Sequence, residues 1–593
     1  MSAIYGLVGE VDKVLLSSMG DRLLHRGRIR SECAPKHDVM LGEYIGGDDE
    51  TPLVNERITL VADAEIYNVD ELRERLVSRG RKFETERDEE VVLHGYLEFG
   101  PTIFRYINGD FAIALWDSDR SLLLLARDAV GSKPLYFWHG KGRFAFSSEY
   151  KGLLALPDIP ALVDLNVLQY LQNSKYIPHN RALIKNICSV PSGHYLEFIE
   201  GNYRKSRYWD LGVNVKNLSI NEHARILRDN FLNAVKRRVF DLSSVGVLLS
   251  GGIDSSSIAS AIRYVRPEIP LHTFTCGYGS KDPEVLTSEI LAGAVQSSHH
   301  SLMADPEDIP RLLPHIVWHL EDPIGSSENL LTFKASMYAA KHVDVVCNGF
   351  GADSLFGGMP RYKIIKLIQW FPWLRTPLEE FYNYTQYSSI PSSMIGRALK
   401  IAYYRGSDSS PPSINGLSTP LSVEQLPKAK HELLNHVLIE VVKNDLSKAF
   451  PKADRLCVAH GLRIRHPFTD LNLIEHAFTI SDRYKIRYWR EKHILREALK
   501  DLLPKEVLNR PKFPQAMKSD LLLSDVLEEL SCQVLSPESV RSRGFFSIYD
   551  IERMRKRFSN KPYTKEQSMR LWTAIMTELW AQVFLDHRGE PIN

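Results

Sequence analysis

Short apolar runs separated by turn residues dominate the first two hundred residues. Five of these runs are bounded by Asp, Gly or Pro, and they lie at Ile58–Ala62, Phe111–Trp116, Leu122–Ala126, Leu135–Trp138 and Phe144–Ser147. Runs of this length are typical of buried strands in a layered sheet domain. One helix is predicted over Val69–Arg79, with Asn68 as its N-cap. The pattern predicts a sheet-rich N-terminal domain.

A different pattern begins after the polar stretch Gly212–Glu222, which we interpret as a linker. Apolar residues first recur at helical spacing, and then predicted strands alternate with predicted helices. The strands are Val245–Leu249, Leu271–Cys276 and Val343–Cys347, and the helices are Ser257–Val265, Glu284–Gln296 and Leu571–Leu585. This alternation favours a parallel sheet with helices on both faces. The sequence therefore predicts two domains, at residues 1–211 and 223–593.

Composition and charge narrow the class of protein. With 593 residues, 44% hydrophobic and 25% charged, the chain is globular rather than disordered, collagen-like or coiled-coil. Its 74 Lys and Arg against 73 Asp and Glu give a net charge of +1, which argues against a general binder of nucleic acid or membrane surfaces. Six scattered cysteines, no C-x-x-C pair and no long apolar run favour a cytoplasmic location. Any anionic ligand must be held by a local site.

The strongest chemical signal is the segment Leu248–Ser256, where a buried strand enters Ser-Gly-Gly and a helix follows. Glycines let the backbone approach an anion closely, and the N–H groups at a helix start point at it. Asp254 would repel phosphate unless a cation lies between them, so it is a candidate Mg²⁺ ligand. The G-x-x-x-x-G-K-[ST] pattern of other phosphate loops is absent.

A second glycine-rich turn, Asn348–Gly358, follows the strand Val343–Cys347. It places Asp353 at the carboxyl edge of the predicted sheet, where ligands of open α/β sheets bind. Asp254 and Asp353 at neighbouring strand ends make a reasonable Mg²⁺ pair.

These segments resemble the motifs of the asparagine synthetase family, nearly end to end. Ser250–Ser256 resembles its SGGxDS pyrophosphatase loop and Gly349–Gly358 its GEGxDELFGG segment. The later blocks that match are Ala453–Phe468, Lys492–Arg496 and Arg510–Lys512. Upstream, His25–Gly27, Glu65–Asn68, Arg127–Asp128 and Gly131–Tyr136 resemble its glutamine-hydrolysing domain.

The resemblance implies a fold and a chemistry. The N-terminal domain would be a class II glutamine amidotransferase-like, Ntn-hydrolase-like αββα sandwich, and the C-terminal domain an ATP-pyrophosphatase parallel-sheet domain with helical elaboration. A carboxylate attacks the α-phosphate of ATP, pyrophosphate leaves, and an amine displaces AMP. The cofactors would be ATP and Mg²⁺. The residues implied are Asp254 and Asp353 as metal ligands, Arg455 and Lys512 as triphosphate clamps, Leu248 and Cys276 in the adenine pocket, and Ser250, Gly251, Gly252, Ser255, Ser256 and Gly349 around the nucleotide.

The N-terminal half departs from the family at its catalytic positions. Glutamine-dependent members begin Met-Cys-Gly, whereas this chain begins Met1-Ser2-Ala3, and a hydroxyl is far less nucleophilic than a thiol. The family's oxyanion-hole Asn-Gly-Glu becomes Asp63-Ala64-Glu65, and a carboxylate opposes a developing oxyanion. We therefore expect an inactive amidotransferase-like domain and an amine that does not come from glutamine.

The synthetase half departs at the acceptor pocket. Phe350, Ser354 and Arg463 occupy positions where the family has Glu, and residues 324–331 lack the Arg that pairs with free aspartate. Such a pocket should bind aspartate poorly and suit a larger acceptor. β-Lactam synthetases place a Tyr–Glu pair at the positions of Phe350 and Arg463, so that branch is disfavoured.

The lasso peptide cyclase branch is our first expectation from sequence. These enzymes have a degenerate amidase domain, adenylate an Asp or Glu side chain of a precursor peptide, and close a macrolactam with the peptide's N-terminal amine. The expected partners are the precursor peptide, a leader peptidase and a leader-recognition protein, with no nucleic acid or membrane. Aromatic residues between Trp370 and Tyr404 would form a wall for the peptide or pack in a core. An asparagine synthetase using aspartate with ammonia or glutamine, and a non-catalytic scaffold, stay open as alternatives.

Overall fold

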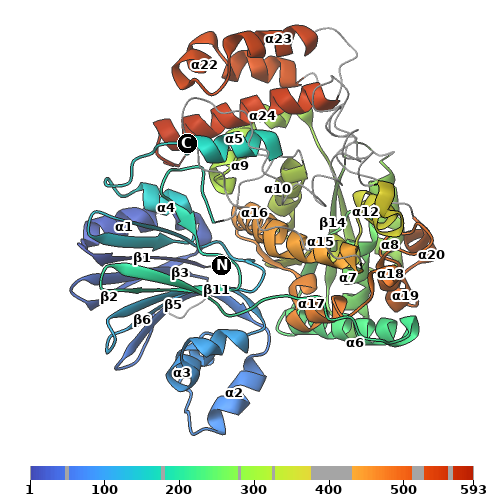
Figure 1. Ribbon diagram of the computed structural model, residues 1–593, viewed down its shortest axis with the longest axis horizontal. Coiled ribbons are helices and arrows are strands. Elements are labelled where there is room, and N and C mark those ends of the chain that lie inside the picture. Colours follow the sequence, from blue (N-terminus) through green and yellow to red (C-terminus); the bar gives the residue numbers. More distant parts are fainter. Residues whose placement is uncertain are drawn as a thin grey trace.

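The computed structural model describes residues 2–46, 52–174, 180–277, 279, 282–323, 328–374, 431–510, 526–558 and 565–591. Figure 1 shows an N-terminal half built from stacked sheets, drawn in blue and teal, beside a C-terminal half in which helices surround a central sheet. The predicted clamp residue Lys512 and positions 375–404 of the aromatic-rich stretch lie outside the described residues.

Two six-stranded antiparallel sheets form the centre of the N-terminal half, in the orders β10-β8-β9-β1-β3-β2 and β12-β11-β7-β6-β5-β4. Their strands are β1 Ala3–Gly9, β2 Ile29–Lys36, β3 Val39–Ile45, β4 Leu53–Val54, β5 Ile58–Ile66, β6 Gly109–Asp117, β7 Leu122–Arg127, β8 Tyr136–Gly140, β9 Arg143–Ser147, β10 Cys188–Ser189, β11 His194–Ile199 and β12 Asn202–Arg207. In β6, Ala112 and Ala114 pack between the sheets while Ile113 and Leu115 pack under helices. Burial on both faces explains why these strands are apolar without alternation.

Helices cover both outer faces and complete the predicted αββα sandwich. Helices α2 (Val69–Val77) and α3 (Glu90–Phe99) pack on the second sheet, and α1 (Lys13–Asp21), α4 (Tyr150–Leu154) and α5 (Leu165–Ser174) pack on the first. Helix α2 begins where predicted, but Asn68 does not cap it through its side chain. Its side-chain Nδ2 instead donates to Tyr106 O, and its Oδ1 accepts from Asn108 N, so the side chain fixes the neighbouring loop.

Five parallel strands form the sheet of the C-terminal half, in the order β15-β14-β13-β16-β17. They are β13 Val245–Leu248, β14 Leu271–Gly277, β15 Ser298–Met303, β16 Val345–Cys347 and β17 Arg463–Arg465. One face packs against α6 (Ile220–Val239) and α7 (Ile253–Val265), and the other against α10 (Glu328–Ala339) and α16 (Ser447–Val458). The predicted fold class is confirmed.

Two helices begin earlier than the sequence suggested. Helix α6 begins at Ile220, inside the stretch interpreted as a linker, because Ser219 and Glu222 form a reciprocal capping box. Helix α7 begins at Ile253 rather than Ser257, since the polar residues 254–256 of its first turn give no apolar periodicity.

The remaining helices elaborate the C-terminal half. They are α8 Pro283–Ala294, α9 Ile309–Leu320, α11 Ala352–Phe356, α12 Arg361–Trp370, α15 Leu433–Val441, α17 Leu471–Ala477, α18 Asp482–Lys485, α19 His493–Leu499, α20 Lys505–Asn509, α22 Pro537–Arg543, α23 Ile548–Phe558 and α24 Lys565–Ala581. Across the described ranges, none of the helices has both the length and the apolar character that a membrane crossing requires. Trp370, Phe371 and Trp373, from the aromatic-rich stretch, are exposed.

Helix α24 joins the two halves. Its Trp580 Nε1 donates to the hydroxyl of Tyr150 on α4 at 2.8 Å and to the carbonyl of Glu321 at 2.9 Å. A single apolar core contains residues of β1, α4, α9 and α24. The outer layer of the first sheet is therefore built partly from the C-terminal part of the chain, as Figure 1 shows for α4, α9 and α24.

Candidate active site

The glycine-rich turn after β13 forms an open cradle at the carboxyl edge of the parallel sheet. Gly251 has φ +64° and Gly252 is the N-cap of α7, a residue without a side chain to occupy the first N–H groups. Ser255 Oγ accepts from Ser250 N at 3.1 Å and lies 3.2 Å from Ser250 Oγ, which closes the turn. This is the local geometry of an anion site at a helix start.

The two predicted metal ligands lie together at this edge. Lys492 Nζ is 2.5 Å from each carboxylate oxygen of Asp254 and 2.5 Å from Asp353 Oδ1. Burial alone would lower the pKa of Lys492, but the charges of Asp254 and Asp353 raise it. Because Asp254 and Asp353 both contact the Lys492 ammonium group, their carboxylates are close enough to bind one metal cation together. Carboxylate oxygens are ligands that Mg²⁺ prefers, so this donor set fits Mg²⁺.

Two glycines permit this close approach. A methyl group on Gly349 would lie 2.7 Å from Asp254 Cβ, and one on Gly358 would lie 1.9 Å from Asp353 Oδ1 and 2.0 Å from Lys492 Cε. The spacing of glycines around Asp353 therefore has a steric reason.

Replacing Gly358 with alanine should reduce ATP-dependent AMP formation by about 10²-fold, because the new methyl group displaces both Asp353 and Lys492 by an ångström or more. The atoms it meets are the ends of side chains, so the melting temperature should change little. Gly293→Ala is the matched control, since no atom lies within 4 Å of the added methyl group. Equal activity in the two variants would contradict this account of Gly358.

Three arginines add positive charge beside the cradle. Arg510 Nη1 donates to Gly251 O at 2.7 Å, which holds the turn in place. Arg496 and Arg490 both donate to Leu508 O, and burial together with the charge of Arg490 lowers the pKa of Arg496 to about 10. The segments that resemble the family include Lys492, Arg496 and Arg510. The motif match alone assigns no role to these three residues.

The predicted adenine-pocket residues lie at neighbouring strand ends. Leu248 ends β13 and Cys276 lies near the end of β14, the strand next to it. Burial raises the pKa of the Cys276 thiol to about 11. Ser256 is fully buried in α7, and its hydroxyl has no hydrogen-bond partner in the described part of the chain.

Arg455 has partners of a different kind. It is buried on α16 and donates to Leu320 O at 2.8 Å, Tyr136 OH at 2.9 Å and Glu321 Oε2 at 2.8 Å. These partners belong to the boundary between the two halves and not to the glycine-rich turns. The structure therefore brings Asp254, Asp353 and the turn residues together but places Arg455 in another cluster.

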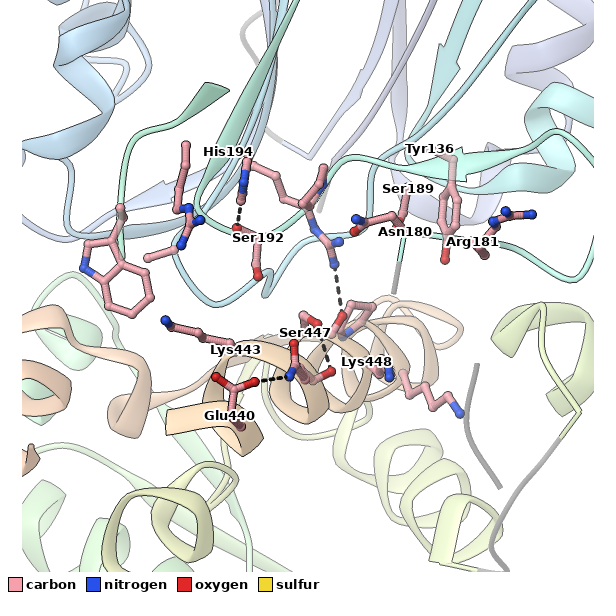
Figure 2. Close-up of a pocket in the computed structure, with 18 of the residues that line it drawn as sticks. Tyr136, Asn180, Arg181, Ser189, Ser192, His194, Glu440, Lys443, Ser447 and Lys448 are labelled. Atoms are coloured by element: carbon pink, nitrogen blue, oxygen red, sulfur yellow. Dashed lines mark hydrogen bonds between the residues drawn. The ribbon is translucent and has the colours of Figure 1, made fainter. Parts of the chain in front are cut away.

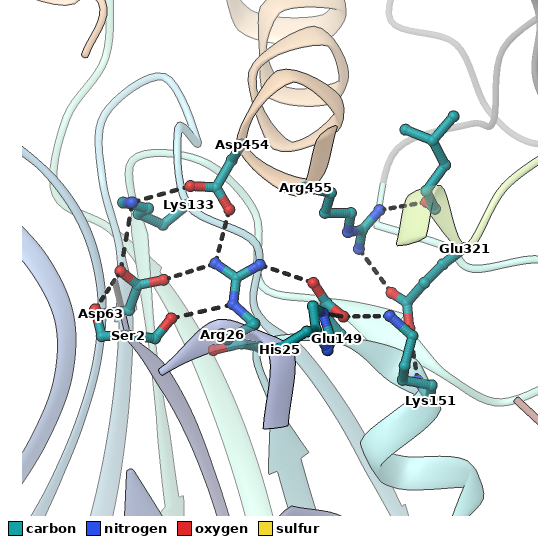
Figure 3. A network of polar contacts seen from close by, with 12 residues as sticks. Ser2, His25, Arg26, Asp63, Lys133, Glu149, Lys151, Glu321, Asp454 and Arg455 are labelled. Atoms are coloured by element: carbon teal, nitrogen blue, oxygen red, sulfur yellow. Dashed lines mark hydrogen bonds and ion pairs between the residues drawn. The ribbon is translucent and has the colours of Figure 1, made fainter. Parts of the chain in front are cut away.

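That cluster is a buried network of charges across the domain boundary (Figure 3). Arg26 is fully buried and donates to Asp63 at 3.1 Å, Glu149 at 2.7 Å and Asp454 at 2.7 Å. Lys133 Nζ donates to Asp454 Oδ1 at 2.9 Å. Burial would raise the pKa of Asp454, but Lys133 and Arg26 lower it to about 2.

The network continues toward Arg455 through Glu149, Lys151 and Glu321. Lys151 contacts Glu149 closely and lies 3.8 Å from Glu321, which in turn pairs with Arg455. Burial raises the pKa of Glu321 to about 7, although Lys151 and Arg455 oppose this. Because Asp454, Arg455 and Glu321 come from the C-terminal half, the network joins the two halves by charge as well as by packing.

Ser2 lies at one end of the same network. Its hydroxyl donates to Asp63 Oδ1 at 2.7 Å, and its carbonyl accepts from Arg26 Nε at 3.0 Å. Glu65, where the family binds glutamine, is ion-paired with Arg465 of β17, which also pairs with Asp241 at 2.7 Å. The groups at the amidase positions thus bind one another and the C-terminal half.

A cavity of about 350 Å³ lies at the same boundary (Figure 2). It is bordered by Tyr136, Arg455 and residues of α15 and α16, and none of its lining residues belongs to the glycine-rich turns. Several lining charges are satisfied locally, since Arg127 donates to Lys133 O and Val190 O and Lys443 pairs with Asp210 at 2.5 Å. The cavity is therefore separate from the candidate nucleotide site.

Comparisons with known proteins agree with this architecture. Residues 226–582 match the model of the asparagine synthase family, and residues 1–209 match that of the glutamine amidotransferase domain. The chain is 29% identical to asparagine synthetase (glutamine-hydrolyzing) 3 of Bacillus subtilis, over 86% of each chain. It is 25% identical to asparagine synthetase (glutamine-hydrolyzing) 1 of the same organism, over 97% of this chain and 95% of the relative.

Two further matches cover less of the chain. Amidase chry2 of Gibberella zeae is 25% identical over 77% of this chain and 76% of its own. Among solved structures, the match to the glutamine phosphoribosylpyrophosphate amidotransferase of Bacillus subtilis covers 45% of this chain and 65% of that chain at 14% identity, with a TM-score of 0.27. The family match over 226–582 and the paired glycine-rich turns lead to one conclusion: the chain belongs to the asparagine synthetase family of ATP-dependent carbon–nitrogen ligases.

Proposed function

We propose that this protein activates a carboxylate with ATP and joins it to an amine. The N-terminal domain does not supply this amine by hydrolysing glutamine. The observation that carries the proposal is the contact between Ser2 and Asp63. A glutaminase needs a nucleophile and donors aimed at an oxyanion. Here the Ser2 hydroxyl donates a hydrogen bond to Asp63, a buried carboxylate at the position where an oxyanion would need donors, and the guanidinium of Arg26 is engaged by three carboxylates.

The C-terminal site supports the activation step. Asp254 and Asp353 would hold Mg²⁺, which neutralises phosphate charge when bound. The N–H groups at the start of α7 would donate to phosphate oxygens, and Lys492 and Arg510 would balance the charge that develops on the leaving pyrophosphate. Leu248 and Cys276 would contact the adenine, and Lys512 would act as a further clamp. The chain's task is then to position the reactants and stabilise charge.

Aspartate and ammonia are the first acceptor and amine to test, because the Bacillus relatives are named asparagine synthetases. With ATP and Mg²⁺, we expect asparagine and AMP from aspartate and an ammonium salt, and none when glutamine replaces ammonium. Asparagine formed equally well from glutamine would contradict the proposed loss of glutaminase activity.

Macrolactam closure in a precursor peptide is the second candidate. It is favoured by Phe350 and Arg463, an exposed aromatic and a cation at positions where the family has Glu. Neither residue suits the amino group of free aspartate, whereas both suit a larger, acidic peptide. A leader peptidase and a leader-recognition protein would then act with this enzyme. AMP formation and a product lighter by one water, seen only with the precursor peptide, would support it over asparagine synthesis.

Replacing Ser2 with alanine should leave AMP formation with the active acceptor unchanged, within about twofold. The hydroxyl is only one of the groups bonded to Asp63, and no step is proposed at it. The measurement is AMP release by chromatography, with glutamine hydrolysis followed in parallel. A large fall in amidation for Ser2→Ala would show that the N-terminal domain supplies the amine.

A further inference from the structure

Three histidines gather on one face of the parallel sheet, apart from the nucleotide edge. His272 lies on β14, His300 lies on the edge strand β15, and His342 follows the C-terminal end of α10. His300 pairs in register with Phe274, two residues beyond His272 and on the same face of β14. Helix α10 covers this face, as Ala339 and Phe274 share one apolar cluster.

Their nitrogen atoms lie close together. One ligand atom from each ring falls within 4.8 Å of the others, and His272 Nδ1 is 3.3 Å from His300 Nε2. Nitrogens bound to one tetrahedral zinc ion at about 2.0–2.1 Å are about 3.4 Å apart. The His272–His300 pair therefore already has ligand spacing, and the exposed His342 has to turn inward by only about an ångström and a half.

Aromatic side chains surround the three imidazoles, whose neutral form binds metal. Phe274 and Tyr338 stand against the rings, at 4.9 Å from His300 and 5.0 Å from His342 between ring centres. Three neutral nitrogen donors with a partly open side suit zinc, nickel or copper rather than magnesium or calcium.

We propose that His272, His300 and His342 form a binding site for one divalent transition-metal ion of the zinc class, with water completing its coordination. The ion would tie the edge strand β15 to β14 and to the end of α10. His272 and Cys276 are four residues apart along β14, or about 13 Å, so the ion would support the sheet and take no part in the reaction. This inference does not depend on the proposed function.

The competing account is a stack of aromatic rings without metal. The planes of His272 and His300 are 6° apart and those of His300 and His342 are 28° apart. Such a stack packs well by itself, and an ion would have to replace the contact between His272 and His300.

Metal titration of the full-length protein separates these accounts. Protein freed of metal with a chelator would be titrated with Zn²⁺ by calorimetry and with Co²⁺ by visible absorption. We expect one ion per chain, a tetrahedral cobalt spectrum, and a higher melting temperature with Zn²⁺. His342→Ala should weaken Zn²⁺ binding by more than about 10-fold, since loss of even a supporting residue costs 10–100-fold.

His299→Ala is the matched control. His299 lies next to His300 on β15, but its ring faces the other side and bonds Thr273 Oγ1 at 2.9 Å. It should keep full affinity, as should Asp254→Asn, which removes a carboxylate of the nucleotide site. Binding that survives in both His300→Ala and His342→Ala, or that is lost in Asp254→Asn, would overturn the proposal. His342 is exposed, so its replacement tests the site without disturbing the core.

Discussion

Replacing Lys492 with methionine should lower the rate of ATP-dependent AMP formation by about 10²–10³-fold, the usual effect of removing one group that stabilises a transition state. Lys492 lies between Asp254 and Asp353 and, of the described residues, is the ammonium group that contacts both. Without it, the carboxylates repel each other and the leaving pyrophosphate loses a positive charge. Calorimetry should also show weaker binding of Mg²⁺–ATP, which makes the test independent of the acceptor.

Lys500→Met is the control for this prediction. Lys500 is the C-cap of α19, the helix for which Lys492 is the N-cap, but its side chain is 60% exposed and, among the described residues, pairs with Glu497 at 3.6 Å. It should keep activity within about twofold, because exposed pairs contribute little. A Lys492→Met enzyme with normal turnover would mean that the two carboxylates meet for a structural reason, and the scaffold reading would then gain support.

Replacing Arg26 with methionine should destabilise the protein by about 3–5 kcal/mol, the typical cost of breaking a buried ion pair from one side. Asp63, Glu149 and Asp454 would lose their shared partner while staying buried. Because Asp454 belongs to the C-terminal half, calorimetric unfolding of this variant should separate into two transitions. The wild type should unfold with its two halves more closely coupled.

Arg207→Met provides the matched surface control, since Arg207 and Asp210 are each about half exposed. It should shift the melting temperature by little.

The pKa of Asp454, lowered to about 2, adds a test by pH. A carboxylate with a lowered pKa stabilises the fold above its unfolded value of about 3.9, and the effect disappears as the pH falls toward 2. The difference between wild type and Arg26→Met should therefore be full above about pH 4 and shrink below it.

Several strands that are buried on both faces could be predicted from sequence, although the buried strands β1 and β3 were not among them. Strands β5 and β7 begin at the predicted residues, Ile58 and Leu122, because apolar runs mark them. Strands β2 and β12 were missed, since they lie at sheet edges, and Asn202–Arg207 is almost entirely polar and exposed. An edge strand shows its register only through its partner, which no local pattern reveals.

The nucleotide edge was partly predictable for a similar reason. Asp254 and Asp353 each follow a buried parallel strand, and such strand ends meet at one edge. Lys492 follows a loop rather than a strand, with φ +53°, so nothing local indicates that it reaches those carboxylates. The pairing of Arg26 with Asp454 spans most of the chain, and only the packing of the two halves brings these residues together.

The shared core of β1 and α24 has a consequence for biosynthesis. Tyr150 on α4 receives a hydrogen bond from Trp580, which the ribosome adds hundreds of residues later. At about 5–20 residues per second, the outer layer of the first sheet stays uncovered for roughly 20–90 s after α4 is made. The N-terminal half therefore cannot finish folding during synthesis, and a fragment ending near Leu211 would keep this apolar surface open to chaperones and to aggregation.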